Sequence, residues 1–194
     1  MPTFDLKGIK IGKYVNTDGA ISYDGITTMG DAMSVNLQLT FAEGRLYAEG
    51  RLAEYIKEIT GGTVSIAVKY IKDAAQTILF GSTTKERTLG EKKVKSTITS
   101  AKDTANYVGM AFYAPDKIDG VKKYTCIFVK KVLFGPPELA CQTKGQNITF
   151  KTPTTTGEFL PDDSNAAELT EVAVVDTEAE AIEWVSLVLG EAAA

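Results

Sequence analysis

The side chains that most often carry out enzymatic chemistry are scarce in this sequence. It contains no histidine, which removes the commonest general base, the usual partner of a Ser or Cys nucleophile, and the commonest metal ligand. Two cysteines, Cys126 and Cys141, are too few for a disulfide framework or a zinc cluster, and we expect free thiols. Asp162 and Asp163 are adjacent carboxylates, but they lie in a polar segment where solvation is a simpler interpretation than metal binding. We therefore predict no catalytic, cofactor-binding or metal-binding residues and a protein that is not an enzyme.

Signatures of phosphate and nucleic-acid binding are also weak. No Gly-rich segment ends in Gly-Lys-Ser or Gly-Lys-Thr, and we interpret Gly8, Gly12 and Gly61-Gly62 as bends and turns. The doublets Lys122-Lys123 and Lys130-Lys131 lie eight residues apart, which is typical of lysines that protect a sheet edge and keep their amines in water. Nucleic-acid binding is disfavoured because the chain is acidic overall and its aromatic residues follow strand patterns.

Charge is divided unevenly along the 194 residues, whose formal net charge is −4. Residues 1–151 hold all 21 Lys and Arg against 15 Asp and Glu, a net charge of +6, whereas residues 152–194 hold 10 acidic residues and no basic one. This acidic end is either a solvated tail or a surface that repels nucleic acid or contacts a basic patch on a neighbour. No apolar run approaches the roughly 20 residues of a membrane span, and the N-terminus lacks an apolar signal core. We expect a protein made in the cytoplasm without a membrane anchor.

Hydrophobic alternation predicts a mainly β chain with minor α content. The expected strands are residues 6–15, 20–23, 34–41, 63–70, 107–114, 121–134, 147–160 and 171–176, with turns at 16–19, 42–44 and 135–137. Residues 52–60 fit either a helical face or a strand. Because Gly61-Gly62 follows directly, we favour a strand, a Gly-Gly turn and a second strand.

The expected strand at 121–134 is much longer than the usual five or six residues and is largely apolar on both faces. Alternation would place Tyr124, Cys126, Phe128, Lys130, Val132 and Phe134 on one face and Thr125, Ile127, Val129, Lys131 and Leu133 on the other. A small domain covers one such face with its own core, so the second face needs a helix, a second sheet or another subunit. This apolar surplus indicates assembly.

Residues 81–105 form a distinct basic segment. They hold few apolar side chains, and six basic residues stand against three acidic ones. Connections of this length are uncommon unless they are functional or disordered, so we expect either a mobile surface loop or a basic excursion that clamps a neighbour. We expect a β domain over residues 1–160 that includes this loop. Residues 161–194 would then be an acidic linker, a short strand and a terminal helix packed on the same domain.

Two helices are expected, a short internal one at 73–80 and a terminal one. Thr177 and Glu180 form a capping box at the start of the terminal helix, and Gly190 ends it. Its apolar stripe consists of Ala181, Ile182, Val185, Val188 and Leu189. Because this stripe must dock on the sheet, we expect Trp184→Ala or Ile182→Asp to destabilise the fold, by roughly 2–5 kcal/mol if the side chain is buried.

Several segments, in this order and spacing, resemble the major tail protein, or tail tube protein, of long-tailed bacteriophages. They are Gly8–Val15, Tyr23–Gly25, Arg45–Glu49, Thr63–Gly81, Gly109–Ala114, Gly120–Tyr124, Phe128–Pro137, Gln142–Gly145 and Val174–Trp184. The resemblance implies a β-sandwich or barrel-like tail-tube fold with one short internal helix and a C-terminal helix. It also implies localisation in the virion tail, after synthesis in the bacterial host cytoplasm.

The resemblance further implies that the chain is a structural subunit. Copies would assemble into hexameric rings, and stacked rings would form the conduit for genome delivery. The partners would be the chain itself and the tape-measure, tail terminator and distal tail proteins, while DNA would pass through the lumen without specific binding. The alternative is a β-sandwich module of a phage or cell-surface particle that binds a receptor or a carbohydrate.

Overall fold

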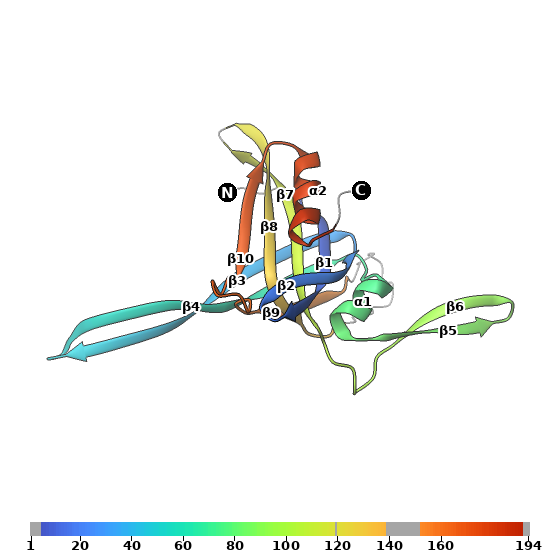
Figure 1. The fold of residues 1–194 in the computed structure, drawn as a ribbon, viewed down its shortest axis with the longest axis horizontal. Coiled ribbons are helices and arrows are strands. Elements are labelled where there is room, and N and C mark those ends of the chain that lie inside the picture. The colour runs from blue at the N-terminus through green and yellow to red at the C-terminus, as the bar shows by residue number, and fades with distance from the viewer. Residues whose placement is uncertain (1–4, 119, 139–151, 192–194) are drawn as a thin grey trace, which may run out of the picture.

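Over the residues that the structure describes, the chain is mainly β with two short helices (Figure 1), which confirms the prediction of a mainly β chain with minor α content. This computed structural model describes residues 5–118, 120–138 and 152–191. The strands are β1 (Lys7–Thr17), β2 (Ala20–Thr28), β3 (Ala32–Ala48), β4 (Arg51–Val68), β5 (Thr83–Leu89), β6 (Lys92–Ile98), β7 (Tyr107–Ile118), β8 (Val121–Phe134), β9 (Thr154–Phe159) and β10 (Thr170–Val175). The helices are α1 (Asp73–Phe80) and α2 (Glu178–Val188). Within the described ranges, no helix is long and apolar enough to cross a membrane.

Most strands belong to one antiparallel sheet in the order β2-β1-β7-β8-β9-β4-β3. The sheet branches at β8, whose first part pairs with β10 and whose last residues pair with β9. Buried side chains of β1, β4, β7, β8 and β9 meet in a single hydrophobic core, so this part of the sheet curls around it. Helix α1 adds Ala75, Leu79 and Phe80 to that core.

A bulge in β8 changes which side chains face the core. Val108 pairs with Val132 and Met110 with Val129, so Gly109 alone lies opposite the two residues Lys130 and Lys131. The extra residue shifts the alternation by one position. The predicted faces of 121–134 are therefore wrong beyond Val129: Val132 and Phe134 join Val129 in the main core, and not the face of Phe128.

The first part of β8 contributes to a second buried cluster on the other side of the sheet. Tyr124, Cys126 and Phe128 pack there with residues of β7 and with Ala181, Val185 and Leu189 of α2. Figure 1 shows α2 lying against this part of the sheet. Of the three expected covers for this second face (a helix, a second sheet or another subunit), the chain supplies a helix, so β8 alone no longer indicates assembly.

Strands β3 and β4 form one long hairpin, and two predicted turns lie inside it. The 42–44 segment continues β3, and the chain reverses at Glu49-Gly50, where both residues have positive φ. The Gly61-Gly62 pair is part of β4, beside a bulge. A Cβ on Gly62 would lie 2.2 Å from the ring of Phe159, so glycine is needed here for close packing and not for a turn.

The basic segment 81–105 is also more regular than expected. Its centre is a second hairpin, β5–β6, which replaces the predicted loop. The predicted strand at 147–160 is represented by β9, and residues 139–151, with Cys141 and most of that prediction's first part, lie outside the described residues. Figure 1 shows the β3–β4 and β5–β6 hairpins extending from the central body in opposite directions.

Candidate assembly interface

The outer part of the β3–β4 hairpin, residues 41–59, projects beyond the body of the protein and will be called the arm. Directly paired residues of antiparallel strands share a face, so the register divides the arm into two faces. The core-side face continues the row of Val35, Leu37 and Leu39, which begins against the main core. Its apolar members are Phe41, Tyr47, Leu52, Tyr55 and Ile59.

These core-side residues are exposed, although the row that they extend is half-buried at Val35 and Leu37. Phe41 is 42% exposed, Leu52 53% and Tyr47 62%. Only the base of the hairpin finds cover, since Val35 and Leu37 pack against the core. Exposed large apolar side chains gathered on one face make it a candidate interaction site.

Polar side chains on the same face hold the arm in shape. The Glu43 carboxylate lies 3.2 Å from the Lys57 amine and 3.5 Å from the Arg45 guanidinium. The Lys57 amine lies 4.2 Å from the centre of the Phe41 ring, and Arg45 covers Tyr55. Hydrogen bonds from Tyr55 and Lys57 lower the pKa of the Glu43 carboxyl. The core-side face therefore combines exposed rings with locally neutralised charge.

The opposite side of the arm, its outer face, has a different composition. It carries Leu46 and Ile56, which are exposed, and the carboxylates Glu54 and Glu58. Among the described residues neither carboxylate forms an ion pair. Arg51 lies on this face too, but at its tip, opposite Ala48.

The β5–β6 hairpin also has two unlike faces. One, the cationic face, carries Lys85, Arg87 and Lys92 with Leu89 and Val94, and its paired positions hold no acidic residue. The other face carries Lys93 and Lys95 with Glu86, which lies 3.9 Å from Lys93. Leu89 is 74% exposed. The cationic face is thus a second uncovered surface with both charge and apolar area.

The acidic C-terminal part is held to the body by ion pairs with lysines of β1 and β8. The pairs are Lys7–Glu178, Lys10–Glu191, Lys123–Asp176, Lys130–Asp162, Lys130–Glu168 and Lys131–Asp163. Six of the ten acidic residues of 152–194 are thus paired within the chain, which corrects the expectation of a solvated tail; a role of this end towards nucleic acid or a neighbour stays a prediction. Lys130 and Lys131 do not lie on a free sheet edge, because their backbones bond to Leu169 and Leu160, whereas Lys122 and Lys123 pair with β7 alone, beyond the end of β10.

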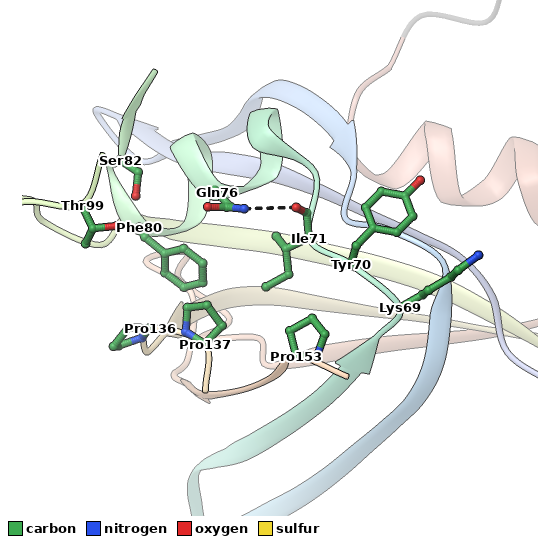
Figure 2. A pocket seen from close by; sticks show the side chains of 10 residues that line it. All are labelled: Lys69, Tyr70, Ile71, Gln76, Phe80, Ser82, Thr99, Pro136, Pro137 and Pro153. Carbon is green, nitrogen blue, oxygen red and sulfur yellow. Dashed lines mark hydrogen bonds between the residues drawn. The ribbon is translucent and has the colours of Figure 1, made fainter. Parts of the chain in front are cut away.

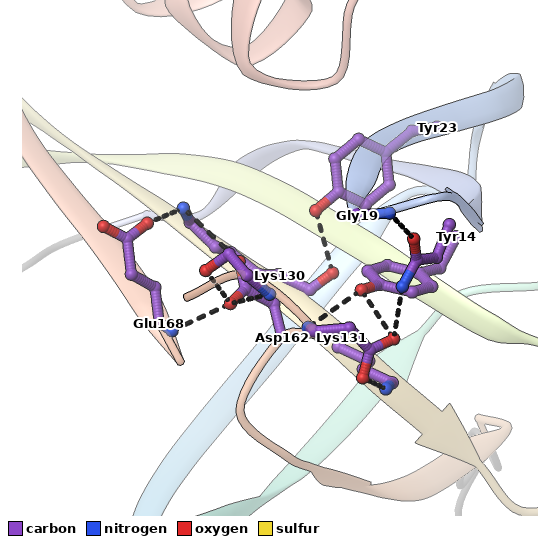
Figure 3. A network of polar contacts seen from close by, with 10 residues as sticks. Tyr14, Gly19, Tyr23, Lys130, Lys131, Asp162 and Glu168 are labelled. Atoms are coloured by element: carbon purple, nitrogen blue, oxygen red, sulfur yellow. Dashed lines mark hydrogen bonds and ion pairs between the residues drawn. The ribbon is translucent and has the colours of Figure 1, made fainter. Parts of the chain in front are cut away.

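Figure 3 shows the centre of these contacts, at the bulge of β8. Asp162, whose side chain is 2% exposed, lies 3.8 Å from the Lys130 amine and accepts hydrogen bonds from Ser164 and from the backbone amide of Glu168. Asp163 lies 2.6 Å from the Lys131 amine. The 161–165 segment is therefore a fixed acidic turn and not the solvated linker that was predicted.

Tyr14 and Asn16 complete the contacts of Asp163. The Tyr14 hydroxyl donates to its carboxylate at 3.0 Å, and the Asn16 amide donates at 3.2 Å. Hydrogen bonds from Lys131, Asn16 and Tyr14 lower the pKa of the Asp163 carboxyl. The arrangement holds the C-terminal segment in place; among the described residues, no group of three or more potential metal ligands is assembled here or elsewhere.

A groove of about 590 Å³ lies between α1 and the prolines that follow β8 (Figure 2). Its lining is largely apolar and includes Tyr70, Phe80, Pro136 and Pro137, and Lys69 is the one charged residue among its described lining residues. Cys126 is buried elsewhere, and burial raises the pKa of its thiol to about 11, which makes it a poor nucleophile. Neither feature brings together groups for a reaction.

No protein-family model matches the chain. A search of curated proteins finds no match either.

The sequence predicted contacts with other copies at β8 and at the basic segment, and it did not predict the arm. The signal was present: Phe41, Tyr47, Leu52, Tyr55 and Ile59 are large apolar residues in a hairpin that the sequence pattern interrupts with an apparent turn at 42–44. Reading β3 as one long strand would have placed these side chains beyond the reach of the core.

Proposed function

We propose that this chain is the structural subunit of a bacteriophage tail tube. Copies assemble into rings, which the sequence resemblance predicts to be hexameric, and the rings stack into a conduit for genome delivery. The chain's partners are then other copies of itself and the proteins that fix tube length and close its ends: tape-measure, tail terminator and distal tail proteins.

One observation carries the proposal: the arm continues the core-facing row of β3 and β4 past the point where the protein can cover it. Burial of apolar area stabilises by roughly 25 cal/mol per Å², so five large exposed side chains on one face favour a partner. A contact between the arm and a different surface of the next copy is heterologous. Heterologous contacts close into rings or continue as filaments.

The described residues also support a passive role for the genome path. They assemble no metal site, and the lysines of β1 and β8 are largely occupied by the chain's own carboxylates. The surface formed by β1 and β8 should therefore retain DNA weakly, because affinity for the phosphate backbone depends on cations that displace counterions.

Negative-stain electron microscopy of the purified chain over a range of concentrations tests the proposal. The proposal predicts hollow rods whose number and length increase with concentration. Particles that stay monomeric or trimeric, together with hits on a glycan array, would instead favour the receptor- or carbohydrate-binding alternative.

A further inference from the structure

The two hairpins carry surfaces that complement each other in charge and in spacing. The cationic face of β5–β6 consists of three successive rows of paired residues: Lys85 with Ser96, Arg87 with Val94, and Leu89 with Lys92. The outer face of the arm also has three rows: Ala42 with Glu58, Gly44 with Ile56, and Leu46 with Glu54. Each row is one step of two residues along a strand, so both sets repeat at about 7 Å.

We propose that the cationic face of the β5–β6 hairpin of one copy packs on the outer face of the arm of a second copy. This inference rests on the proposed self-assembly and names two of the surfaces that form it.

The charges of the two faces match whether the two hairpins run in the same direction or in opposite directions. Each end row of the cationic face holds one lysine, Lys85 or Lys92, and each end row of the arm's outer face holds one carboxylate, Glu58 or Glu54. Along the axis of its hairpin, Lys85 lies two rows, or about 13 Å, from Lys92, which is on the other strand. Glu54 and Glu58 are separated by the same distance along β4. When the central rows meet, both lysines lie within reach of a carboxylate.

The central rows supply apolar contact, and Gly44 leaves space for a side chain of the second copy. Val94 and Ile56 are exposed, and Gly44 has no atom within 4 Å of the position a Cβ would occupy. The Arg87 side chain can therefore cross the arm above Gly44. Exposed ion pairs each contribute little, so burial of Leu46, Ile56, Leu89 and Val94 supplies most of the affinity, whereas the charges select the partner and its register.

The placement of the hairpins suits a repeating contact. They extend from the body in opposite directions (Figure 1), so a copy that offers its β5–β6 hairpin to one neighbour still offers its arm to another. A second copy is favoured over nucleic acid because the cationic face presents two exposed apolar side chains, and the acidic surface that matches them is on the same chain.

Charge reversal in two separate variants tests the contact. One variant carries Lys85→Glu and Lys92→Glu, and the other carries Glu54→Lys and Glu58→Lys. Each variant alone places like charges at the contact, so we expect loss of rods and at least about a tenfold rise in the protein concentration needed for polymerisation, measured by sedimentation and electron microscopy. An equimolar mixture should restore rods. The reversed β5–β6 face of the first variant then meets the reversed arm of the second, and the unaltered β5–β6 face of the second meets the unaltered arm of the first.

The matched control carries Lys93→Glu and Lys95→Glu, the same change of charge on the opposite face of the same hairpin. It should polymerise like the unaltered chain. The proposal is overturned if either charge-reversed variant polymerises normally, if the mixture stays unassembled, or if the control is impaired equally. Normal rods from the Lys85→Glu, Lys92→Glu variant with loss of binding to a DNA oligonucleotide would assign the cationic face to nucleic acid.

These results separate the contact from the proposed function. Rods from the unaltered chain with no effect of charge reversal would reject this contact and keep the tube. An unaltered chain that never assembles would reject both.

Discussion

The Tyr23 hydroxyl donates a 3.1 Å hydrogen bond to the backbone carbonyl of Lys130, at the bulge where the alternation of β8 changes. The Tyr23 ring lies over Gly109, where a Cβ would be 2.4 Å from a ring carbon, and it packs edge-on against Phe128. Burial raises the pKa of the Tyr23 hydroxyl. One side chain of β2 therefore fixes the point at which β8 passes from the second cluster to the main core.

Removing this hydrogen bond should destabilise the fold modestly. We expect Tyr23→Phe to lower the free energy of unfolding by about 1 kcal/mol, since a buried carbonyl loses its donor while the ring remains. Gly109→Ala should cost more, because a methyl group would collide with the ring. Urea titration of both variants measures the difference, and equal stability of all three proteins would contradict this role.

The ion pairs of the C-terminal part should make stability depend on acid pH. The pKa values of Asp163, Glu178 and Glu191 are lowered, each first of all by a hydrogen bond from a lysine. A carboxyl whose pKa is lower in the folded state stabilises the fold above its unfolded pKa, about 4, and loses that contribution as the pH falls further. We expect constant stability from about pH 7 to 5 and a decrease below about pH 4.

Asp163→Asn provides the control for this pH dependence. It should be less stable than the unaltered chain at neutral pH, because Lys131 loses its partner, and the difference should shrink below about pH 4. Urea titrations at several pH values measure it, and a difference that does not change with pH would exclude the ionised carboxylate as its cause.

The loss of stability caused by substitutions in α2 should depend on how deeply each side chain is buried, and not only on whether it belongs to the apolar stripe. Trp184 packs against the second cluster, so Trp184→Ala should lower the free energy of unfolding by about 2 kcal/mol. Ile182 is 49% exposed, so it lacks the burial on which a large effect of Ile182→Asp depends, and we expect a change in the free energy of unfolding within about 0.5 kcal/mol. Thermal melting of both variants checks this order, which the reverse result would contradict.

The sequence predicted correctly those elements whose formation depends on residues close together in the chain. The internal helix at 73–80 and the Thr177–Glu180 capping box are confirmed because both follow from short-range spacing. The β8 bulge and the role of Gly62 were missed because they depend on Tyr23 and Phe159, which are distant in the sequence. The pairing of acidic residues with lysines of β1 and β8 was missed for the same reason.

The β5–β6 hairpin was missed for a different physical reason. Hydrophobic alternation predicts a strand because one face is buried, and all of β5 is exposed. Its residues pair with each other without contributing to the core, so the pattern that identifies other strands is absent here.

Shortening the β5–β6 hairpin should separate folding from assembly. We expect replacement of residues 83–98 by a short Gly-Ser turn to leave a folded subunit that cannot elongate into tubes. Helix α1 would lose the hydrogen bond from the Thr97 hydroxyl to Asp73, but it keeps its core side chains and the hydrogen bond from the Asn106 backbone amide to the Leu79 carbonyl. Circular dichroism and electron microscopy check the two halves of this prediction, and normal tubes from the shortened chain would contradict the second.

The central claim is that the core-side face of the arm is covered by another copy of the chain. Sedimentation velocity from micromolar to millimolar concentration tests it most directly, with a Phe41→Asp, Ile59→Asp variant as comparison. We predict that the unaltered chain shifts to large, fast-sedimenting assemblies as its concentration rises, while the variant stays folded and sediments as a single 20.9 kDa chain. An unaltered chain that sediments as a single subunit at every concentration would contradict the claim.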